Sequence, residues 1–477
     1  MASFKEVLGH GRNYLIASLA TKALGFISIP VYTRILSTTE YGIVSIFIGV
    51  VGILNSIFTL GVDRAISRYY FDQKDSDDFK NFVGISFFLA GVIFLINSLL
   101  LIFFSEYISN ITKLPKELII FILPVTFVNI IGLTFEQIFG PMKKSSLIAS
   151  SSLVRVYLTF GISVVIILII KNNKYFGPVI GQTIAGFLMI TYWFFRINPY
   201  IKIPEIKKEQ IKYILTYSIP LIPYALSGVL IEQFAKLSIA NIQNVSQAGF
   251  YTLTLSIAGL TTLFIGITDQ AWTPYYFEYM NSKNYSKHDR DVCWIFKITL
   301  FVAIFIASFG NEIGKILAPA KYSGLLYLIP IFSIGYVFYQ LAYVYMRNFG
   351  YSRKTIYLTL IVLLSSIVNI LLNILLIPSM GEIGAAISFS GSYIIMAFLS
   401  WLINKFIIYC HGTPILLFLK YILYTIPLFI FIYYSLTSNN YLFFLAARFL
   451  VLIAAFVILF WKEKEIIINT IKAMKKK

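Results

Sequence analysis

The chain has 477 residues, of which 58% are hydrophobic and 13% are charged, and its mean hydropathy is +0.81. Soluble proteins usually carry about 25% charged residues, so this composition excludes an ordinary soluble domain. The net charge of +18 fits nucleic-acid binding, but it equally fits a membrane protein with basic cytoplasmic loops.

Apolar runs of the length that spans a bilayer recur along the whole chain, as in Val83–Phe104 and Leu442–Trp461. Their continuity favours helices over the alternating strands of a barrel. We therefore predict an all-α integral membrane protein with about fourteen transmembrane helices. The predicted spans cover residues 13–36, 42–66, 81–105, 116–140, 146–170, 175–195, 213–238, 248–272, 293–317, 324–347, 355–377, 382–405, 414–436 and 440–462.

Lysine and arginine are distributed unevenly between the alternate connections of this arrangement. One side, which holds both termini and the connection with Arg347, Arg353 and Lys354, carries 26 of them, and the other side carries 5. This bias predicts cytoplasmic N- and C-termini. It also explains most of the positive charge, so we expect no nucleic-acid partner. Residues 1–15 lack the pattern of a signal peptide and are expected to form a cytoplasmic tail.

An internal repeat is visible at a spacing of 206 residues. Asp63–Asp72 reads DRAISRYYFD and Asp269–Glu278 reads DQAWTPYYFE, with five identities in ten positions. A weaker echo joins Tyr175–Gly181 to Glu382–Ser388 at a spacing of 207. The repeat predicts two parallel six-helix lobes, residues 1–200 and 201–410, followed by two further helices and a basic tail in residues 411–477.

Charged residues inside the predicted spans are the candidates for a site, because such groups are costly in lipid. Lys22 and Arg155 each lie about nine residues into a span, at a depth of roughly 14 Å. Two cations at this depth predict a water-filled cavity that attracts an anion such as phosphate or pyrophosphate. The alternative is a buried ion pair, for example between Arg155 and Glu136.

Further charged residues have simpler alternatives. Lys236 follows Glu232 by four residues, so the two can pair on one helix face or act together in the cavity. Glu312 and Lys315 have a similar spacing. Arg448 lies about eight residues into the last span, where it would mark a groove between the appended helices and the second lobe.

The duplicated Asp63 and Asp269 lie at predicted cytoplasmic helix ends. We predict a gate in which Arg64 or Arg68 reaches Asp269 when the transporter is closed. The alternative is that each aspartate only caps or anchors its own loop.

No sequence motif indicates a cofactor, an ATP site or a metal site. Cys293 and Cys410 form no CxxC motif or Cys/His cluster, and no GxxxxGK[ST] segment is present. The connections of about 15–20 residues are also too short for the polar domain that a membrane glycosyltransferase or polymerase would need. The chain is therefore not expected to be an enzyme.

The segment Asn13–Asp72 resembles the Wzx-type polysaccharide flippases, the transporters of O-antigen and capsule units. The resemblance rests on the sequences PVYTRIL, EYG, LGVDRA and SRYY, at residues 30–36, 40–42, 60–65 and 67–70. These flippases belong to the multidrug/oligosaccharidyl-lipid/polysaccharide (MOP) superfamily. The resemblance implies two six-helix lobes in a V shape, with two added helices.

The resemblance also implies a function for the chain. Its substrate would be an undecaprenyl-pyrophosphate-linked oligosaccharide, moved by alternating access from the cytoplasmic to the periplasmic leaflet of a bacterial inner membrane. A gradient of H⁺ or Na⁺ would drive it, membrane lipid would surround it, and a glycan polymerase would be a partner. The cation-lined cavity of the family suggests Lys22, Arg34, Arg64 and Arg155 as binding residues. The alternative within the superfamily is a drug/cation antiporter, although a basic cavity disfavours cationic drugs.

Overall fold

A computed structural model describes residues 24–73, 76–438 and 441–461, and every regular element in these ranges is helical. Hydrocarbon offers no partner to backbone polar groups, and a helix satisfies them within a single segment. After the helix Leu24–Ile35, the elements are α2 (Thr38–Thr59), α3 (Val62–Asp72), α4 (Asp77–Phe103), α5 (Ser105–Thr112), α6 (Lys116–Phe139), α7 (Ser145–Ile169), α8 (Phe176–Ile197), η1 (Asn198–Tyr200), α9 (Lys208–Ser218), η2 (Ile219–Leu221), α10 (Ile222–Ile242), α11 (Val245–Ala258), α12 (Leu260–Asn281), α13 (Tyr285–Leu317), η3 (Ala320–Leu328), α14 (Ile329–Tyr351), α15 (Ile356–Ile403), η4 (Asn404–Ile408), α16 (Ile415–Thr437) and α17 (Tyr441–Phe460).

The helices confirm the predicted all-α, multi-pass membrane fold. Among the described residues, 12 helical segments are long and apolar enough to cross a membrane. One of them, Ile356–Ile408, holds two predicted spans, which are separated by a break in helical geometry at Gly381. Leu24–Ile35 is the described part of the first predicted span. With these two, the segments correspond to the fourteen predicted spans.

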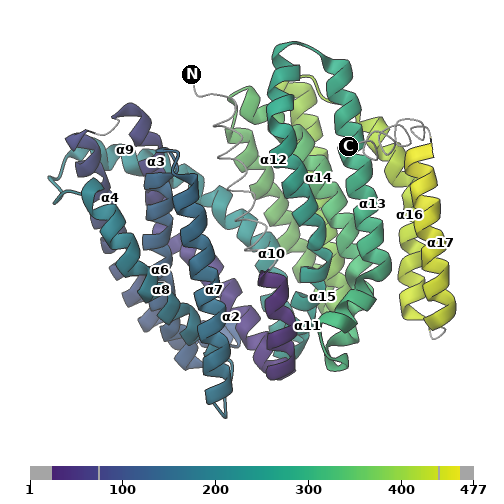
Figure 1. Ribbon diagram of the computed structural model, residues 1–477, viewed down its shortest axis with the longest axis horizontal. Coiled ribbons are helices and arrows are strands. Elements are labelled where there is room, and N and C mark those ends of the chain that lie inside the picture. Colours follow the sequence, from purple (N-terminus) through teal and green to yellow (C-terminus); the bar gives the residue numbers. More distant parts are fainter. Residues whose placement is uncertain (1–23, 74–75, 439–440, 462–477) are drawn as a thin grey trace, which may run out of the picture. The chain divides into compact units, whose positions relative to one another are not determined.

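The chain divides into two compact units (Figure 1). Unit 1 comprises residues 1–252 and 373–381, and unit 2 comprises residues 253–372 and 382–477. The division between them falls inside α11 and α15. The lobe boundaries at residues 200 and 410, which the repeat suggested, stay a prediction.

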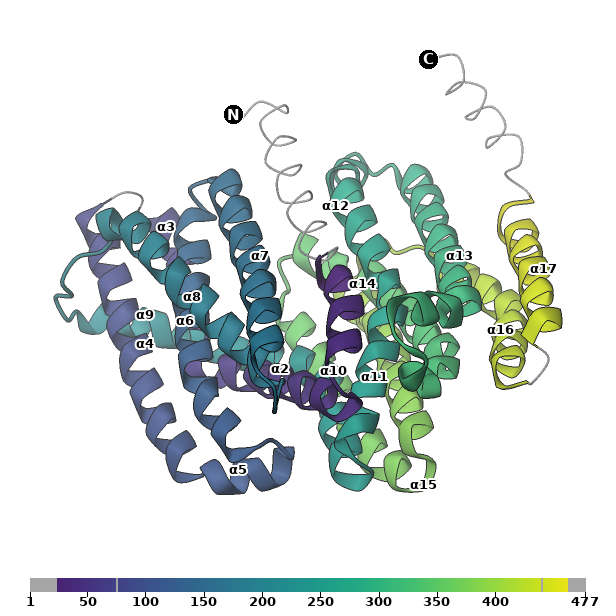
Figure 2. The same ribbon diagram turned by 60° about the horizontal axis from the view of Figure 1, so that its bottom comes forward.

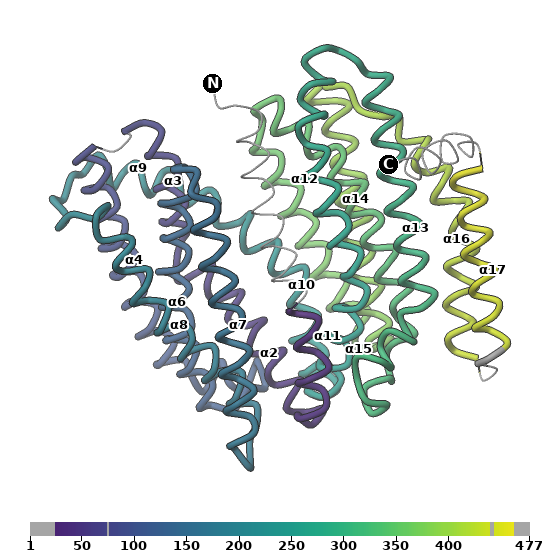
Figure 3. Tube along the Cα trace, viewed as in Figure 1, coloured from purple at the N-terminus to yellow at the C-terminus, as the bar shows by residue number. Residues whose placement is uncertain are grey.

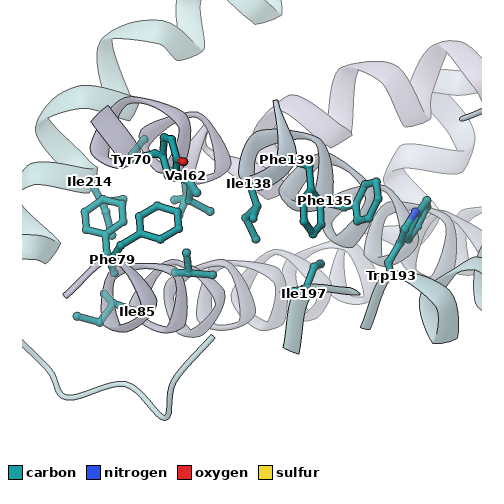
Figure 4. Packing of buried hydrophobic residues seen from close by; sticks show 14 of the residues in the cluster. Val62, Tyr70, Phe79, Ile85, Phe135, Ile138, Phe139, Trp193, Ile197 and Ile214 are labelled. Carbon is teal, nitrogen blue, oxygen red and sulfur yellow. The ribbon is translucent and has the colours of Figure 1, made fainter. Parts of the chain in front are cut away.

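Unit 1 is held together by apolar packing of α3, α4, α6, α8 and α9 at one end of the unit. Figure 4 shows part of the cluster, in which Tyr70, Phe79 and Ile214 lie together and Phe135 and Trp193 lie together further along. All five side chains are buried. The cluster fixes α6 and α8 against each other, and these two helices flank α7 in unit 1.

The start of α2 lies against the start of α11, and equivalent positions of the repeat contact each other there. Thr39 Oγ1 lies 2.9 Å from Ser246 Oγ, and Ser45 hydrogen-bonds Thr252, both at a sequence separation of 207. Gly42 and Gly249 share this spacing. A Cβ on Gly42 would lie 2.1 Å from the carbonyl oxygen of Val245, so only glycine permits the approach. Both contacts lie within unit 1, and the predicted duplication stays a prediction.

Unit 2 is built around α13, which packs against α12, α14, α16 and α17. The last two helices run side by side as a hairpin, as Figures 1 and 2 both show. In the tube of Figure 3, α12, α13 and α14 can be followed as neighbouring helices.

A buried ion pair fixes α17 to α13. The Arg448 guanidinium contacts both oxygens of Glu312, at 3.0 and 3.3 Å, and donates to the Ser308 carbonyl at 2.7 Å. The Arg448 side chain is 1% exposed. This bidentate contact is the strong form of an arginine–carboxylate ion pair. This pair gives Arg448 a structural role, and its predicted place in a lipid groove stays a prediction.

Arg448→Ala should destabilise the protein, because it leaves Glu312 without its partner. Removing one member of a buried pair costs on the order of 3 kcal/mol, whereas replacing both members is far milder. We therefore expect a lower thermal unfolding midpoint in detergent for Arg448→Ala, and partial recovery for Arg448→Met with Glu312→Gln. The exposed Arg353→Ala is the control and should keep the wild-type midpoint. Equal midpoints for the double and single variants would contradict this account.

Candidate functional site

Arg155 lies on α7, where α6 and α8 flank it, and it has a neutral hydrogen-bond partner. Its guanidinium donates to the amide oxygen of Asn129 on α6 and lies 5.5 Å from the ring centroid of Trp193 on α8. The carboxylate of Glu136 is close enough to interact electrostatically. Within the described ranges, however, no carboxylate closes an ion pair with Arg155. This arrangement differs from a direct ion pair between Arg155 and Glu136, which was the alternative interpretation of the sequence.

The surroundings of Arg155 hold it in place. Trp193 Nε1 donates to Ser151 Oγ at 2.7 Å, which fixes the indole ring between α7 and α8. Stacking on a tryptophan face stabilises a guanidinium without neutralising it. The side chain of Arg155 is thus ordered by Asn129 and Trp193, and the carboxylate of Glu136 acts on its charge without a direct contact.

An open apolar hollow runs along α7. Its empty volume, which includes open solvent, is about 940 Å³. The lining residues are Leu153, Val154, Tyr157, Leu158, Gly161, Ile162 and Val165. They belong to the same helix as Arg155, which is not itself among them.

Of the other predicted cavity residues, Lys22 lies outside the described residues. Lys236 is buried on α10 and interacts with Glu232, one turn earlier on the same helix. Arg34 is exposed, and its guanidinium donates to the carbonyl of Pro30 at 2.9 Å. Arg64 is half-buried in the first turn of α3. Arg155, Lys236, Arg34 and Arg64 lie on separate helical segments of unit 1, and their joint role as a binding site stays a prediction.

The first repeated motif forms a break between α2 and α3. Leu60 and Gly61 both have left-handed backbone conformations, with φ of 43° and 68°, which ends α2 and lets α3 begin at Val62. Asp63 then lies buried in the first turn of α3. A helix N-terminus favours such a charge. This position fits an aspartate that anchors its own loop.

The second motif pairs its aspartate with an arginine that the sequence had placed in a connection. Asp269 on α12 forms an ion pair with Arg347 on α14. The Arg347 guanidinium also lies over the rings of Trp272 and Tyr276, at 4.6 and 5.5 Å. Asp269 and Arg347 are 78 residues apart, and no spacing rule connects positions at that distance. Arg68 pairs at 2.8 Å with Asp72 on its own helix. The predicted gate between Asp269 and Arg64 or Arg68 stays a prediction.

The basic connection after α8 is fastened to unit 1 rather than extended into solvent. Lys207 Nζ lies 2.6 Å from Asp78 Oδ1, and this hydrogen bond raises the pKa of Lys207. Asn81 exchanges hydrogen bonds with the backbone of Glu205 at 2.9 and 2.7 Å. The start of α9 is therefore held beside α4.

Comparisons with known proteins identify the family to which the chain belongs. A model of the polysaccharide biosynthesis protein family matches residues 13–280, more than half of the chain. An uncharacterized membrane protein of Methanocaldococcus jannaschii is 22% identical over 442 residues, which cover 84% of this chain and 85% of the relative. A protein of the Lsg locus of Haemophilus influenzae is 24% identical over 400 residues, 78% of this chain and 93% of its own.

Solved transporter structures share the fold. The inward-closed lipid II flippase MurJ superposes with a TM-score of 0.69 at 17% identity, covering 95% of this chain and 99% of its own. A MOP-superfamily transporter from Pyrococcus furiosus superposes with a TM-score of 0.60 at 14% identity, covering 85% and 96%. The resemblance to polysaccharide flippases is thereby confirmed. The chain belongs to the polysaccharide biosynthesis protein family and has the fold of the MOP-superfamily transporters.

Proposed function

We propose that the protein flips a polyprenyl-pyrophosphate-linked oligosaccharide from the cytoplasmic to the outer leaflet of a bacterial cytoplasmic membrane. The family supports a transporter of a lipid-linked glycan. The observation that carries the substrate class is Arg155, a cation inside a membrane helix whose hydrogen-bond partner is a neutral amide.

Two other arginines show why this partner matters. Arg347 and Arg448 both form ion pairs with carboxylates, Asp269 and Glu312, so their charges are balanced within the protein. Arg155 forms no such ion pair among the described residues, although Glu136 acts on its charge from a greater distance, and a charge is costly in hydrocarbon. An anionic ligand such as a pyrophosphate would relieve that cost and would gain charge-assisted hydrogen bonds.

The hollow on α7 fits the other half of such a substrate. A polyprenyl-linked glycan combines an anionic pyrophosphate with a long apolar chain. Arg155 would meet the pyrophosphate, and the apolar surface that begins at Leu153 and Val154 would contact the first isoprene units. Lys22, from the same predicted lobe, would supply a second cation.

The direction and energy source complete the proposed cycle. The charge bias places both termini in the cytoplasm, where lipid-linked units are assembled. An H⁺ or Na⁺ gradient would drive alternating access, and the released unit would be available to a glycan polymerase on the outer side.

Arg155→Ala should lower surface glycan strongly in cells that depend on this protein. Loss of a hydrogen bond to a charged group costs about 1.5–3 kcal/mol, which corresponds to a decrease of about 10- to 100-fold. Arg155→Lys keeps the charge and should retain part of the activity, and Lys22→Ala should act in the same direction. Surface glycan would be quantified at matched protein levels.

The control for Arg155 is Arg196→Ala, which removes an exposed cation from α8 and should leave surface glycan unchanged. Undiminished glycan in the combined Lys22→Ala and Arg155→Ala variant would contradict the cationic site. A loss that Arg155→Lys shares in full would point to packing rather than charge.

The pair of Asp269 and Arg347 should act as one unit in transport. Asp269→Asn and Arg347→Gln should each lower surface glycan on the order of tenfold. The double variant should make no less glycan than the less active of the two single variants, because all three remove the same interaction. A second cycle, Asp269→Asn with Arg68→Gln, tests the gate. Coupling there would show that Asp269 exchanges partners, and strict additivity would contradict the gate. Arg290→Gln, which removes another exposed cation, is the control.

A further inference from the structure

Two histidines and an aspartate meet at the start of α13. His288 and Asp289 lie in the first turn of this helix, and His411 lies in the connection between η4 and α16. His288 Nδ1 is 3.0 Å and His411 Nε2 is 2.9 Å from the same atom, Asp289 Oδ1. The Thr413 hydroxyl donates to that oxygen too, at 2.8 Å.

The distances between these atoms fit metal coordination. One ligand atom from each of His288, Asp289 and His411 lies within 4.8 Å of the other two. In a tetrahedral zinc site with bonds of about 2.0–2.1 Å, neighbouring ligand atoms are roughly 3.3 Å apart. Without an ion, the same atoms form a hydrogen-bonded network in which His288, His411 and Thr413 all contact one carboxylate oxygen. With an ion, the two imidazole nitrogens would instead direct their lone pairs at the cation.

We propose that His288, Asp289 and His411 bind a divalent transition-metal ion, with Zn²⁺ as the best-fitting ion. Two imidazole nitrogens and one carboxylate oxygen are a donor set that zinc accepts. The His288 side chain is 3% exposed, whereas those of Asp289 and His411 are 27% and 25% exposed. The group is thus closed on one side and open on the other, which leaves a path for the ion and a fourth position for water.

Neutral contacts hold the ligands in place without an ion. Asn348 Nδ2 donates to the His411 carbonyl and Tyr345 Oη donates to the Thr413 carbonyl, both at 2.8 Å. The His411 ring stacks on Tyr285, with centroids 4.1 Å apart. His288 is packed against Trp272 and Tyr276. Such outer contacts orient ligands and raise metal affinity.

The site would act as a clip within unit 2. It joins the connection that leads into α16 to the beginning of α13, the helix against which α16 and α17 both pack. The charge count predicts that this end of α13 is cytoplasmic. Bound metal would therefore fix the appended helices from the cytoplasmic side, independently of the proposed substrate.

The test is metal binding by the full-length protein, purified in detergent through a tag without histidine and stripped with a chelator. Zn²⁺ titration by calorimetry should show one site, and Co²⁺ should give the absorption bands of tetrahedral coordination. His411→Ala and Asp289→Asn should each weaken Zn²⁺ binding by about 100-fold or more, because first-ligand losses exceed the 10- to 100-fold losses of outer contacts. Zn²⁺ should raise the unfolding midpoint of the wild type and not of these variants.

Asp291→Asn is the matched control, since it removes an acid two residues further along α13 that bonds Tyr279 and Arg290 instead. It should keep the wild-type affinity. Absence of Zn²⁺ binding by folded wild-type protein would overturn the proposal and leave a hydrogen-bonded network only. Binding that His411→Ala and Asp289→Asn do not weaken would also overturn it, because the ion would then lie elsewhere.

Discussion

The constraint that governs this molecule is that a charge within the hydrocarbon layer must be compensated by protein atoms. The buried cations meet it in different ways. Arg448 is neutralised by Glu312 and thereby fixes the last helix, and Arg347 is neutralised by Asp269 between two aromatic rings. Arg155 is ordered by an amide and an indole, and Glu136 acts on its charge without a direct contact. This difference is the basis for proposing Arg155, rather than Arg347 or Arg448, as the anion-binding residue.

A second constraint is the close contact between α2 and the start of α11. Thr39 and Ser246 contact each other at a separation of 207 residues, and Gly42 allows the backbone of Val245 to approach closely. The aspartates of the two similar motifs have different surroundings. Asp63 lies buried in the first turn of α3, whereas Asp269 forms an ion pair with Arg347 on α14.

The sequence was sufficient for the helices, because hydropathy is a local property of the chain. At Gly381, with φ of 57° and ψ of −134°, the helical geometry breaks between the two spans predicted at residues 355–377 and 382–405. The contact partners of the charged side chains were harder to predict from the sequence. Arg347 was counted among the cytoplasmic loop cations, and Glu312 was explained by Lys315 rather than Arg448. His288 and His411 are 123 positions apart, so their convergence on Asp289 has no signature in the sequence.

The three charged clusters therefore differ in the ligands that they could bind. The pair of Arg448 and Glu312 is saturated by mutual contacts and a backbone carbonyl, so any ligand would have to break it. The group around Asp289 is partly open and rich in lone pairs, which suits a cation. Arg155 offers N–H donors on the helix that also lines the apolar hollow, which suits the amphipathic anion that we propose. The proposed substrate cation thus lies in unit 1, whereas the pair of Arg448 and Glu312 and the proposed metal site lie in unit 2.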